Sequence, residues 1–352
     1  MFTMESNAGK EEIAGLCNAI KQMGLQARRV NGEHYITIHP IGDEEGVNLE
    51  NLASMPGVKS FKAVQGRYKI IARENHEEYA GNQNVMPITI GSENPVTLGN
   101  GELIIIAGPC AVQTYDQTYE VAMAAKEAGA QILRGGTLKP RSSAHSNMGA
   151  LEERTEILIQ VGKDVGMPVM TEVLDQDHVS YLNDKVDAMW TGARRAVSDP
   201  LYRHVGSKSK VPVLIKNNIY FTNVGDWLAS AEYVAKEGNT DIALIYRGEL
   251  GEASSNRDGK FNSKAILFAN KESVCPIIVD PSHSAGRTWM VESLIYSSVA
   301  LPGVKGLMIE VIPEGAEPGD IETDYQQALR PSEFGPIVQR AKEMYAVVHA
   351  EK

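Results

Sequence analysis

Cysteine is scarce in this sequence, which also lacks any long apolar run and any block of basic residues. The three cysteines, Cys17, Cys110 and Cys275, are too few and too scattered for a disulfide framework, which indicates a reducing compartment. No stretch stays apolar over the roughly 18 residues that a membrane-spanning helix needs, and residues 1–12 lack the apolar centre of a signal peptide. We therefore expect a soluble, cytoplasmic protein with no membrane partner.

The charge balance argues against nucleic acid as a partner. Asp and Glu number 45 against 34 Lys and Arg, which gives a formal net charge of -11. No cluster of Lys and Arg resembles a nucleic-acid-binding arm. Cations that stand near the ends of predicted strands are therefore informative, because the rest of the chain is acidic.

The first 75 residues alternate between helical and strand-like patterns. Apolar positions in residues 10–23 recur at helical spacing and stop at Gly24, which predicts a helix. A second helix is predicted over residues 47–58. Alternating or apolar runs predict a strand at 34–42 and one or two further strands over 60–65 and 68–73. Two helices against a small sheet resemble a ferredoxin-like or ACT-like arrangement.

The length of 352 residues fits one barrel of about 250 residues plus this smaller α+β module. We predict that the module spans residues 1–75, that the polar residues 76–85 form a linker, and that residues 86–352 form the larger domain. That domain should open with a hairpin made of residues 87–91 and 95–99.

Eight apolar strands alternate with helical segments after this hairpin. Each strand is nearly continuous in apolar residues, as parallel strands buried on both faces should be. The predicted strands are 102–108, 131–136, 168–173, 187–193, 212–217, 241–248, 276–282 and 306–311. Eight such units over about 240 residues predict an α/β fold, a (β/α)8 TIM barrel, rather than an open doubly wound sheet.

Cations gather where the predicted strands end, which is where a TIM barrel carries its reacting groups. The second strand runs into GGTLKPRSSAHS, residues 135–146. Arginine binds oxyanions through two parallel hydrogen bonds, and serine hydroxyls complete the shell. The candidate anion-binding residues are Arg134, Lys139, Arg141, Ser142 and Ser143 from this strand and its loop, with Arg194, Lys216 and Arg247 from strands four to six. They predict a pocket for more than one phosphate or carboxylate.

A second set of polar residues follows strands one, seven and eight, which barrel closure makes neighbours. Cys110, His283 and Glu310 supply a thiolate, an imidazole and a carboxylate, a set that suits a divalent first-row metal, with Mn, Fe, Co or Zn all fitting. The loop after strand eight offers Asp320, Glu322 and Asp324, any of which could supply a fourth oxygen. Taken alone, Cys110 would be a small buried apolar residue.

These motifs, in order along the barrel, resemble 3-deoxy-D-arabino-heptulosonate 7-phosphate (DAHP) synthases of the branch related to 3-deoxy-octulosonate 8-phosphate (KDO8P) synthases. The matching stretches are IAGPC (106–110), LRGGTLKPRSS (133–143), TEV (171–173), GAR (192–194), PVLIK (212–216), RG (247–248), DPSHSAGR (280–287) and MIEV (308–311). The N-terminal module resembles the ferredoxin-like regulatory domain of some members. The resemblance implies metal-dependent condensation of phosphoenolpyruvate with erythrose 4-phosphate, releasing phosphate, as the first step of the shikimate pathway towards aromatic amino acids.

The resemblance also implies roles for single residues. The implied metal ligands are Cys110, His283, Glu310 and Asp324, the last placed by the D-x-x-Q-x-L spacing. Cys110 favours the metal-dependent class, since metal-independent KDO8P synthases have Asn there. The implied phosphoenolpyruvate contacts are Arg134, Lys139, Glu172, Arg194, Lys216 and Arg247, and the implied acceptor-phosphate contacts are Arg141, Ser142 and Ser143. Lys139 is the candidate proton-transfer group, and Cys110 and His283 act in catalysis through the metal.

The sequence departs from the family pattern in four places. Asn217-Asn218 replaces Arg-Gly after Lys216, and Tyr246 replaces Glu before Arg247. Residues 195–198 replace an Asn/Gln-rich run, and residues 144–149 differ from the common acceptor-loop sequence. Two alternatives therefore stay open: the same chemistry with another aldose phosphate or aldehyde, and a non-catalytic relative that binds aromatic metabolites. The N-terminal module predicts feedback inhibition by Phe or Tyr and a homo-oligomer, either a dimer or a tetramer.

Overall fold

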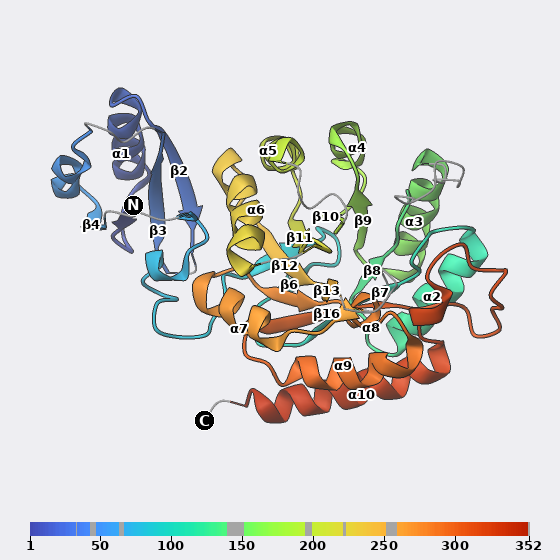
Figure 1. Ribbon diagram of the computed structural model, residues 1–352. Coiled ribbons are helices and arrows are strands. Elements are labelled where there is room, and N and C mark those ends of the chain that lie inside the picture. The colour runs from blue at the N-terminus through green and yellow to red at the C-terminus, as the bar shows by residue number, and fades with distance from the viewer. Residues whose placement is uncertain are drawn as a thin grey trace.

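The computed structural model describes residues 1–32, 34–42, 47–62, 67–138, 151–193, 199–220, 223–250 and 259–350. Figure 1 shows a small module beside a larger barrel, with the module next to helix α6 (Val224–Glu237). Arg28 of the module donates to the carbonyl of Lys236 at the end of α6, with Nε 3.1 Å from the oxygen. Within the described residues, no helix is both long and apolar enough to cross a membrane.

The module is a four-stranded antiparallel sheet with one helix packed on it. The sheet order is β2-β3-β1-β4, with β1 (Phe2–Met4), β2 (Gln26–Asn31), β3 (Ile36–Ile41) and β4 (Val58–Phe61). Helix α1 (Lys10–Gln22) buries Ile13, Leu16 and Ile20 against Phe2 and Met4 of the first strand. The periodicity of residues 10–23 therefore predicted α1 correctly, because one face of that helix forms the module's core.

Two predictions for this module were wrong. The second helix is only a 3-10 segment, η1 (Leu49–Ser54), which starts after Asn48 caps the N–H of Glu50. Residues 68–73 form no strand of the module; they lie along the barrel, where the carbonyl of Ile71 accepts from the N–H of Val274. Their apolar character comes from packing on the barrel, where Ile70 and Ile71 are 2% and 4% exposed.

The segment between module and barrel is held by buried polar groups. The carboxylate of Glu232, on α6, accepts the backbone N–H groups of Lys69, Ile70 and Ile71 at 2.8 to 3.1 Å. Arg73, at the start of η2 (Arg73–Asn75), is 5% exposed and donates to the carbonyls of Asn270 and Ser273 at 2.8 and 2.9 Å. A planar guanidinium that bonds to several carbonyls fixes a path of the chain, because all its donors share one plane.

A buried histidine pair next to this segment makes stability depend on pH. Burial lowers the pKa of His76 from 6.5 to about 4, and burial also holds the pKa of His39, whose ring lies 5.8 Å away, well below 6.5. Between pH 6.5 and about pH 4, His76 binds a proton in the unfolded chain and not in the folded protein. The free energy of unfolding therefore decreases as pH falls. For His76 alone the shift is worth on the order of 3 kcal/mol.

We therefore expect the thermal unfolding midpoint to drop as pH falls from 6.5 to 4, and the drop to be smaller in His76→Gln. Glutamine keeps a donor for the carbonyl of Ile70, which lies 2.7 Å from the ring Nε2. Scanning calorimetry at closely spaced pH values measures both slopes. The exposed His34 supplies the control, His34→Gln, which should keep the original slope; an unchanged slope in His76→Gln would contradict the assignment.

The barrel is closed by eight parallel strands, which confirms the predicted fold class. In spatial order they are β10 (Ala188–Thr191), β11 (Val213–Lys216), β12 (Ile242–Tyr246), β15 (Ile277–Val279), β16 (Val304–Glu310), β7 (Ile104–Gly108), β8 (Ile132–Arg134) and β9 (Val169–Val173). The predicted hairpin is also present as β5 (Ile88–Ile90) and β6 (Val96–Leu98). Its Ile88, Ile90 and Leu98 pack with lumen residues and close one end of the barrel.

The other helices surround this barrel. They are α2 (Tyr115–Glu127), α3 (Leu151–Val165), α4 (Gln176–Leu182), α5 (Asp199–Lys208), α7 (Ser263–Glu272), α8 (Pro281–Ala285), α9 (Thr288–Val299) and α10 (Pro331–Val348). Short strands β13 (Glu249–Leu250) and β14 (Gly259–Lys260) pair with each other after β12, and η3 (Tyr325–Gln327) follows β16. Figure 1 shows α9 and α10 side by side along one flank.

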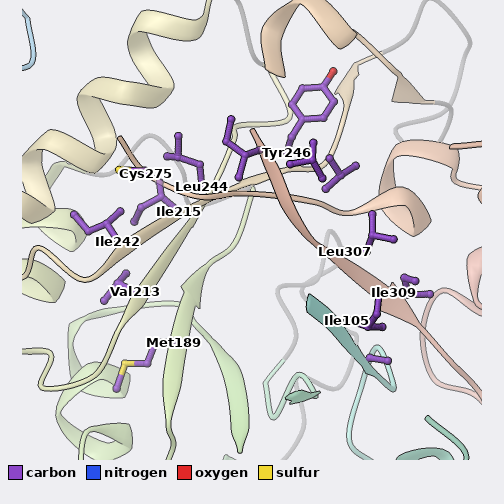
Figure 2. Packing of buried hydrophobic residues seen from close by; sticks show 14 of the residues in the cluster. Ile105, Met189, Val213, Ile215, Ile242, Leu244, Tyr246, Cys275, Leu307 and Ile309 are labelled. Atoms are coloured by element: carbon purple, nitrogen blue, oxygen red, sulfur yellow. The ribbon is translucent and has the colours of Figure 1, made fainter. Parts of the chain in front are cut away.

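Strand residues alternate between two apolar clusters. One cluster contains only strand and hairpin residues and fills the lumen, among them Ile106, Trp190 and Leu214. The other lies between strands and helices; Figure 2 shows it from close by, with Ile215, Leu244 and Tyr246 labelled. The alternation decides which residues at the strand ends can reach the mouth of the lumen.

Candidate active site

The alternation of the strands directs four charged side chains into the barrel. Arg134, Glu172, Lys216 and Glu310 each stand two residues after a lumen residue, and all four are at most 8% exposed. They belong to four strands of one closed parallel barrel, so their carboxyl ends meet at a single mouth. The structure therefore brings the described part of the sequence-derived set together at one end.

Glu310 also belongs to a group of three residues whose side-chain atoms commonly bind metals. The ligand atoms of Cys110, Glu310 and Asp324 all lie within 4.8 Å of one another, and Cys110 Sγ donates to Asp324 Oδ2 at 2.9 Å. The fourth candidate, His283, places Nε2 3.7 Å from Glu310 Oε1. All four residues that the D-x-x-Q-x-L spacing and the strand ends pointed to are therefore neighbours.

Asp280 orients this histidine. Its Oδ2 lies 2.8 Å from His283 Nδ1, and its Oδ1 accepts the backbone N–H of His283 as the N-cap of α8. A carboxylate beside Nδ1 favours the proton on that nitrogen and leaves Nε2, which lies 3.7 Å from Glu310 Oε1, as the nitrogen that can bind a metal. Sequence reasoning placed Asp280 at the strand end without a role; the signal was an Asp before Pro three residues ahead of the histidine.

The carboxylate of Asp280 also contacts a cation, and so connects the candidate metal ligands with the candidate anion-binding residues. Lys216 Nζ lies 2.8 Å from Asp280 Oδ2, and both side chains are at most 5% exposed. Burial on its own would raise the pKa of Asp280, but His283 and Lys216 beside it hold that pKa well below its usual range. Asp280 is therefore an anion shared by a cation and a histidine.

Arg134 and Glu310 form a second buried pair. Arg134 Nη1 lies 2.8 Å from Glu310 Oε1, and each side chain is 1% exposed. Gln327 Nε2 donates to the other oxygen of Glu310 at 2.7 Å. The carboxylate is thus fixed through both oxygens, in a position that faces Cys110 and Asp324.

Trp190 forms the floor under the two cations. Its ring centroid lies 5.1 Å from the guanidinium carbon of Arg134 and 5.9 Å from Lys216 Nζ. Trp190 is fully buried in the lumen cluster and is therefore a packing residue of the barrel core. It also stabilises both cations through its π face.

Family models and known proteins match most of the chain. The DAHP synthetase I family matches residues 85–348, and the DAHP synthase ferredoxin-like domain matches residues 2–66. The chain belongs to the DAHP synthetase I family. The resemblance stated from its motifs is therefore confirmed, and so is the ferredoxin-like character of its N-terminal module.

Individual proteins of known name are also similar to this chain. A phospho-2-dehydro-3-deoxyheptonate aldolase of Thermotoga maritima is 33% identical over 98% of this chain and 97% of the relative. A 2-dehydro-3-deoxyphosphooctonate aldolase of Syntrophobacter fumaroxidans is 27% identical over 72% of this chain and 90% of the relative. A crystal structure of the Thermotoga DAHP synthase matches with a TM-score of 0.73 over 99% of this chain and 97% of that one, at 32% identity.

Two departures from the DAHP synthase pattern now have structural explanations. Asn217, fully buried, accepts the N–H of Arg247 at 2.7 Å and donates to the carbonyl of Gly248 at 2.9 Å. It thus holds the turn that carries Arg247. Tyr246 lies in the outer cluster, where its hydroxyl accepts the N–H of Asn262 at 2.8 Å, so it does not face the lumen.

Glu172 explains a glycine of the GAR motif. A Cβ added at Gly192 would lie 1.8 Å from Glu172 Oε1, so any larger residue would push the carboxylate aside. The remaining site residues of the sequence-derived set lie outside the described residues. They are Lys139, Arg141, Ser142, Ser143 and Arg194.

Proposed function

We propose that this chain is the DAHP synthase that its family membership indicates, condensing phosphoenolpyruvate with erythrose 4-phosphate to give DAHP and phosphate. The observation that carries the proposal is a metal-type donor cluster in direct contact with buried cations at the barrel mouth, linked through Glu310 to Arg134 and through Asp280 to Lys216. The Thermotoga relative, matched over nearly its full length, bears this activity in its name.

We further propose that Cys110, His283, Glu310 and Asp324 hold a divalent metal, with Mn, Fe, Co or Zn as the candidates. The donor set fits, since a thiol, an imidazole and two carboxylates meet in a largely buried space and the imidazole is already oriented by Asp280. A bound divalent cation would polarise the aldehyde oxygen of the acceptor as a Lewis acid.

The cations bind and orient the anionic substrates. Arg134, Lys216 and Arg247, together with Lys139, Glu172 and Arg194, are the proposed phosphoenolpyruvate contacts, and Arg141, Ser142 and Ser143 are the proposed contacts of the acceptor phosphate. Holding both substrates in attack geometry removes most of the entropy cost of a bimolecular step. C3 of phosphoenolpyruvate then bonds to the aldehyde carbon, water adds at C2 and phosphate leaves. Lys139 is the proposed proton-transfer group.

An acceptor panel tests this function. Purified protein supplied with phosphoenolpyruvate, Mn²⁺ and one of several aldose phosphates should release phosphate and form a periodate-reactive 3-deoxy acid with erythrose 4-phosphate. Turnover only with another aldehyde would move the protein to the alternative acceptor class. No product with any C3 to C5 aldehyde would overturn the catalytic proposal and leave a metabolite-binding relative.

The N-terminal module is proposed to regulate this activity, with Phe or Tyr as the effector and a homodimer or homotetramer as the assembly. We propose a regulatory domain over residues 1–75, a linker over 76–85, a catalytic domain over 86–352 and a cytoplasmic location. Arg73 and the backbone at residues 69–71 are bonded to the barrel, so a truncation should spare them.

We expect a variant that lacks residues 1–66 to keep its turnover and to lose inhibition by Phe and Tyr. The truncation removes the whole ferredoxin-like match and leaves the bonds of Arg73 and Glu232 in place. Initial rates measured against effector concentration compare it with the full chain, whose own inhibition is the control. Inhibition of equal strength in both proteins would contradict the proposed regulatory role.

A further inference from the structure

Asp324 has a backbone conformation that needs outside support. Its φ of 61° is the only positive φ at a non-glycine residue in the described part of the chain. Non-glycine residues rarely adopt this left-handed region, although Asp does so more often than most, and the conformation costs free energy that the surrounding structure must offset. Whatever enforces this backbone therefore also sets the direction of the Asp324 carboxylate towards Cys110.

The chain is fixed on both sides of this residue. On the C-terminal side, Gln327 bonds to Glu310 through its amide, and its N–H bonds to the carbonyl of Asp324 at 3.0 Å. Thr288 Oγ1 donates to the carbonyls of Gln326 and Ala328 at 3.0 and 3.2 Å. This side is therefore anchored to the barrel through η3.

The N-terminal side is anchored by two residues that no motif singled out. Arg154 of α3 donates two hydrogen bonds to the carboxylate of Glu322, from Nη1 to Oε2 at 3.0 Å and from Nη2 to Oε1 at 2.6 Å. Gln113 accepts the N–H of Glu322 at 2.9 Å and donates to the carbonyl of Asp320 at 2.9 Å. We name Arg154, Gln113 and Glu322 the loop clamp.

We propose that the loop clamp positions Asp324 as the fourth metal ligand, and that Arg154 and Gln113 are therefore positioning residues for metal affinity. The inference rests on the proposed metal site. Arg154 is 9% exposed and lies on a regular helix of 15 residues, so it offers a rigid support. A bidentate pair fixes direction as well as distance, and Glu322 stands two residues before Asp324.

The clamp also explains which acid of the loop completes the set. Asp320 Oδ2 accepts the N–H of Glu317 at 2.8 Å, and Glu322 is bound to Arg154. Of the three acids that the sequence left open, Asp324 is the one whose carboxylate lies in the cluster with Cys110 and Glu310. The neighbouring acids thus shape the loop.

Metal binding by the apo-protein tests the proposal without relying on turnover. Co²⁺ is titrated in competition with a chelator of known affinity, and the cobalt–thiolate charge-transfer band reports occupancy at Cys110. Arg154→Ala should bind Co²⁺ about tenfold to a hundredfold more weakly, which is the usual effect of losing a residue that orients a ligand. Arg154→Lys should also bind weakly, because an ammonium cannot form the two parallel bonds.

Glu322→Gln should weaken binding too, and Arg154→Ala combined with Glu322→Gln should be no weaker than Arg154→Ala alone, since both act through one contact. The matched control is Arg203→Ala, which removes another Arg–Glu pair, with Glu237, from the exposed flank of the barrel at 3.1 Å. That variant should bind Co²⁺ as the unmodified protein does.

The possible outcomes distinguish failure of the proposed metal site from failure of the loop clamp. If the unmodified protein shows no thiolate band, the proposed metal site fails. If it binds and Arg154→Ala binds equally tightly, only the clamp is refuted. Should Arg154→Ala not fold, Arg154→Lys and Gln113→Leu decide in its place: weakened binding in both supports the clamp, and affinity equal to that of Arg203→Ala refutes it.

Discussion

Protein with Cys110→Ala, assayed with phosphoenolpyruvate, erythrose 4-phosphate and Mn²⁺, should release phosphate about 10³-fold more slowly than the unmodified protein. The substitution removes the thiolate from a cluster whose three ligand atoms lie within 4.8 Å of one another. Without the thiolate, the remaining donors would bind a divalent cation weakly. The aldehyde would then lose the polarisation that lowers the activation barrier of the condensation. Coupled phosphate detection measures the rate.

Cys17→Ala is the matched control for this substitution. Cys17 lies in α1 of the module, far along the chain from the barrel mouth, and its variant should keep the original rate and the original cobalt–thiolate band. A rate in Cys110→Ala close to that of Cys17→Ala would contradict the assignment of Cys110 and would favour a mechanism without a metal at this position.

The second large effect is expected at Asp280, which contacts both clusters. Asp280→Asn leaves Lys216 buried without its carboxylate partner, and breaking such a pair costs about 3 to 5 kcal/mol of stability. It also removes the anion that keeps Nε2 of His283 directed at Glu310. Loss of such a support lowers activity or metal affinity about tenfold to a hundredfold. Denaturant unfolding and phosphate release should both register the change.

Asp226→Asn supplies the comparison for this pair of effects. Asp226 makes an exposed ion pair with Arg67, 2.6 Å apart, on α6, and exposed pairs contribute about 0 to 1 kcal/mol. That variant should therefore be nearly as stable and as active as the unmodified protein. An Asp280→Asn protein with unchanged metal affinity and unchanged stability would show that Asp280 does not connect the two clusters.

The barrel could be predicted because each of its strands carries a local signal. Parallel strands buried on both faces need apolar runs such as residues 104–108, and these runs were visible without knowledge of their partners. The metal-type cluster followed from barrel closure, which places strands one, seven and eight side by side. The closed barrel topology therefore predicted correctly that residues at the ends of these three strands lie close together.

The orientation of Tyr246 could not be predicted in the same way. Both faces of β12 are apolar, so the sequence does not distinguish the lumen from the helix layer. The replacement of Glu by Tyr therefore looked like a change in the substrate pocket. In the structure it is a packing residue between Trp227 and Phe261, whose ring centroids lie 6.1 and 5.7 Å away.

Long-range polar contacts were also beyond the sequence. Arg154 and Glu322 are separated by 168 positions, and no spacing rule connects them. Residue chemistry alone left three nearby acids open, and only the D-x-x-Q-x-L spacing of the family singled out Asp324; the left-handed backbone of that residue was not visible in the sequence. The position of residues 68–73 could not be predicted either, because their apolar pattern fits a strand of the module and a segment packed on the barrel equally well.

The most direct test of the central claim is a crystal structure of the protein with Mn²⁺ and phosphoenolpyruvate, with anomalous diffraction used to locate the metal. We predict one strong peak bonded to Cys110, His283, Glu310 and Asp324, and phosphoenolpyruvate in contact with Arg134, Lys216 and Arg247. Mn²⁺ bound elsewhere while these four side chains keep only their contacts to one another would contradict the proposed site.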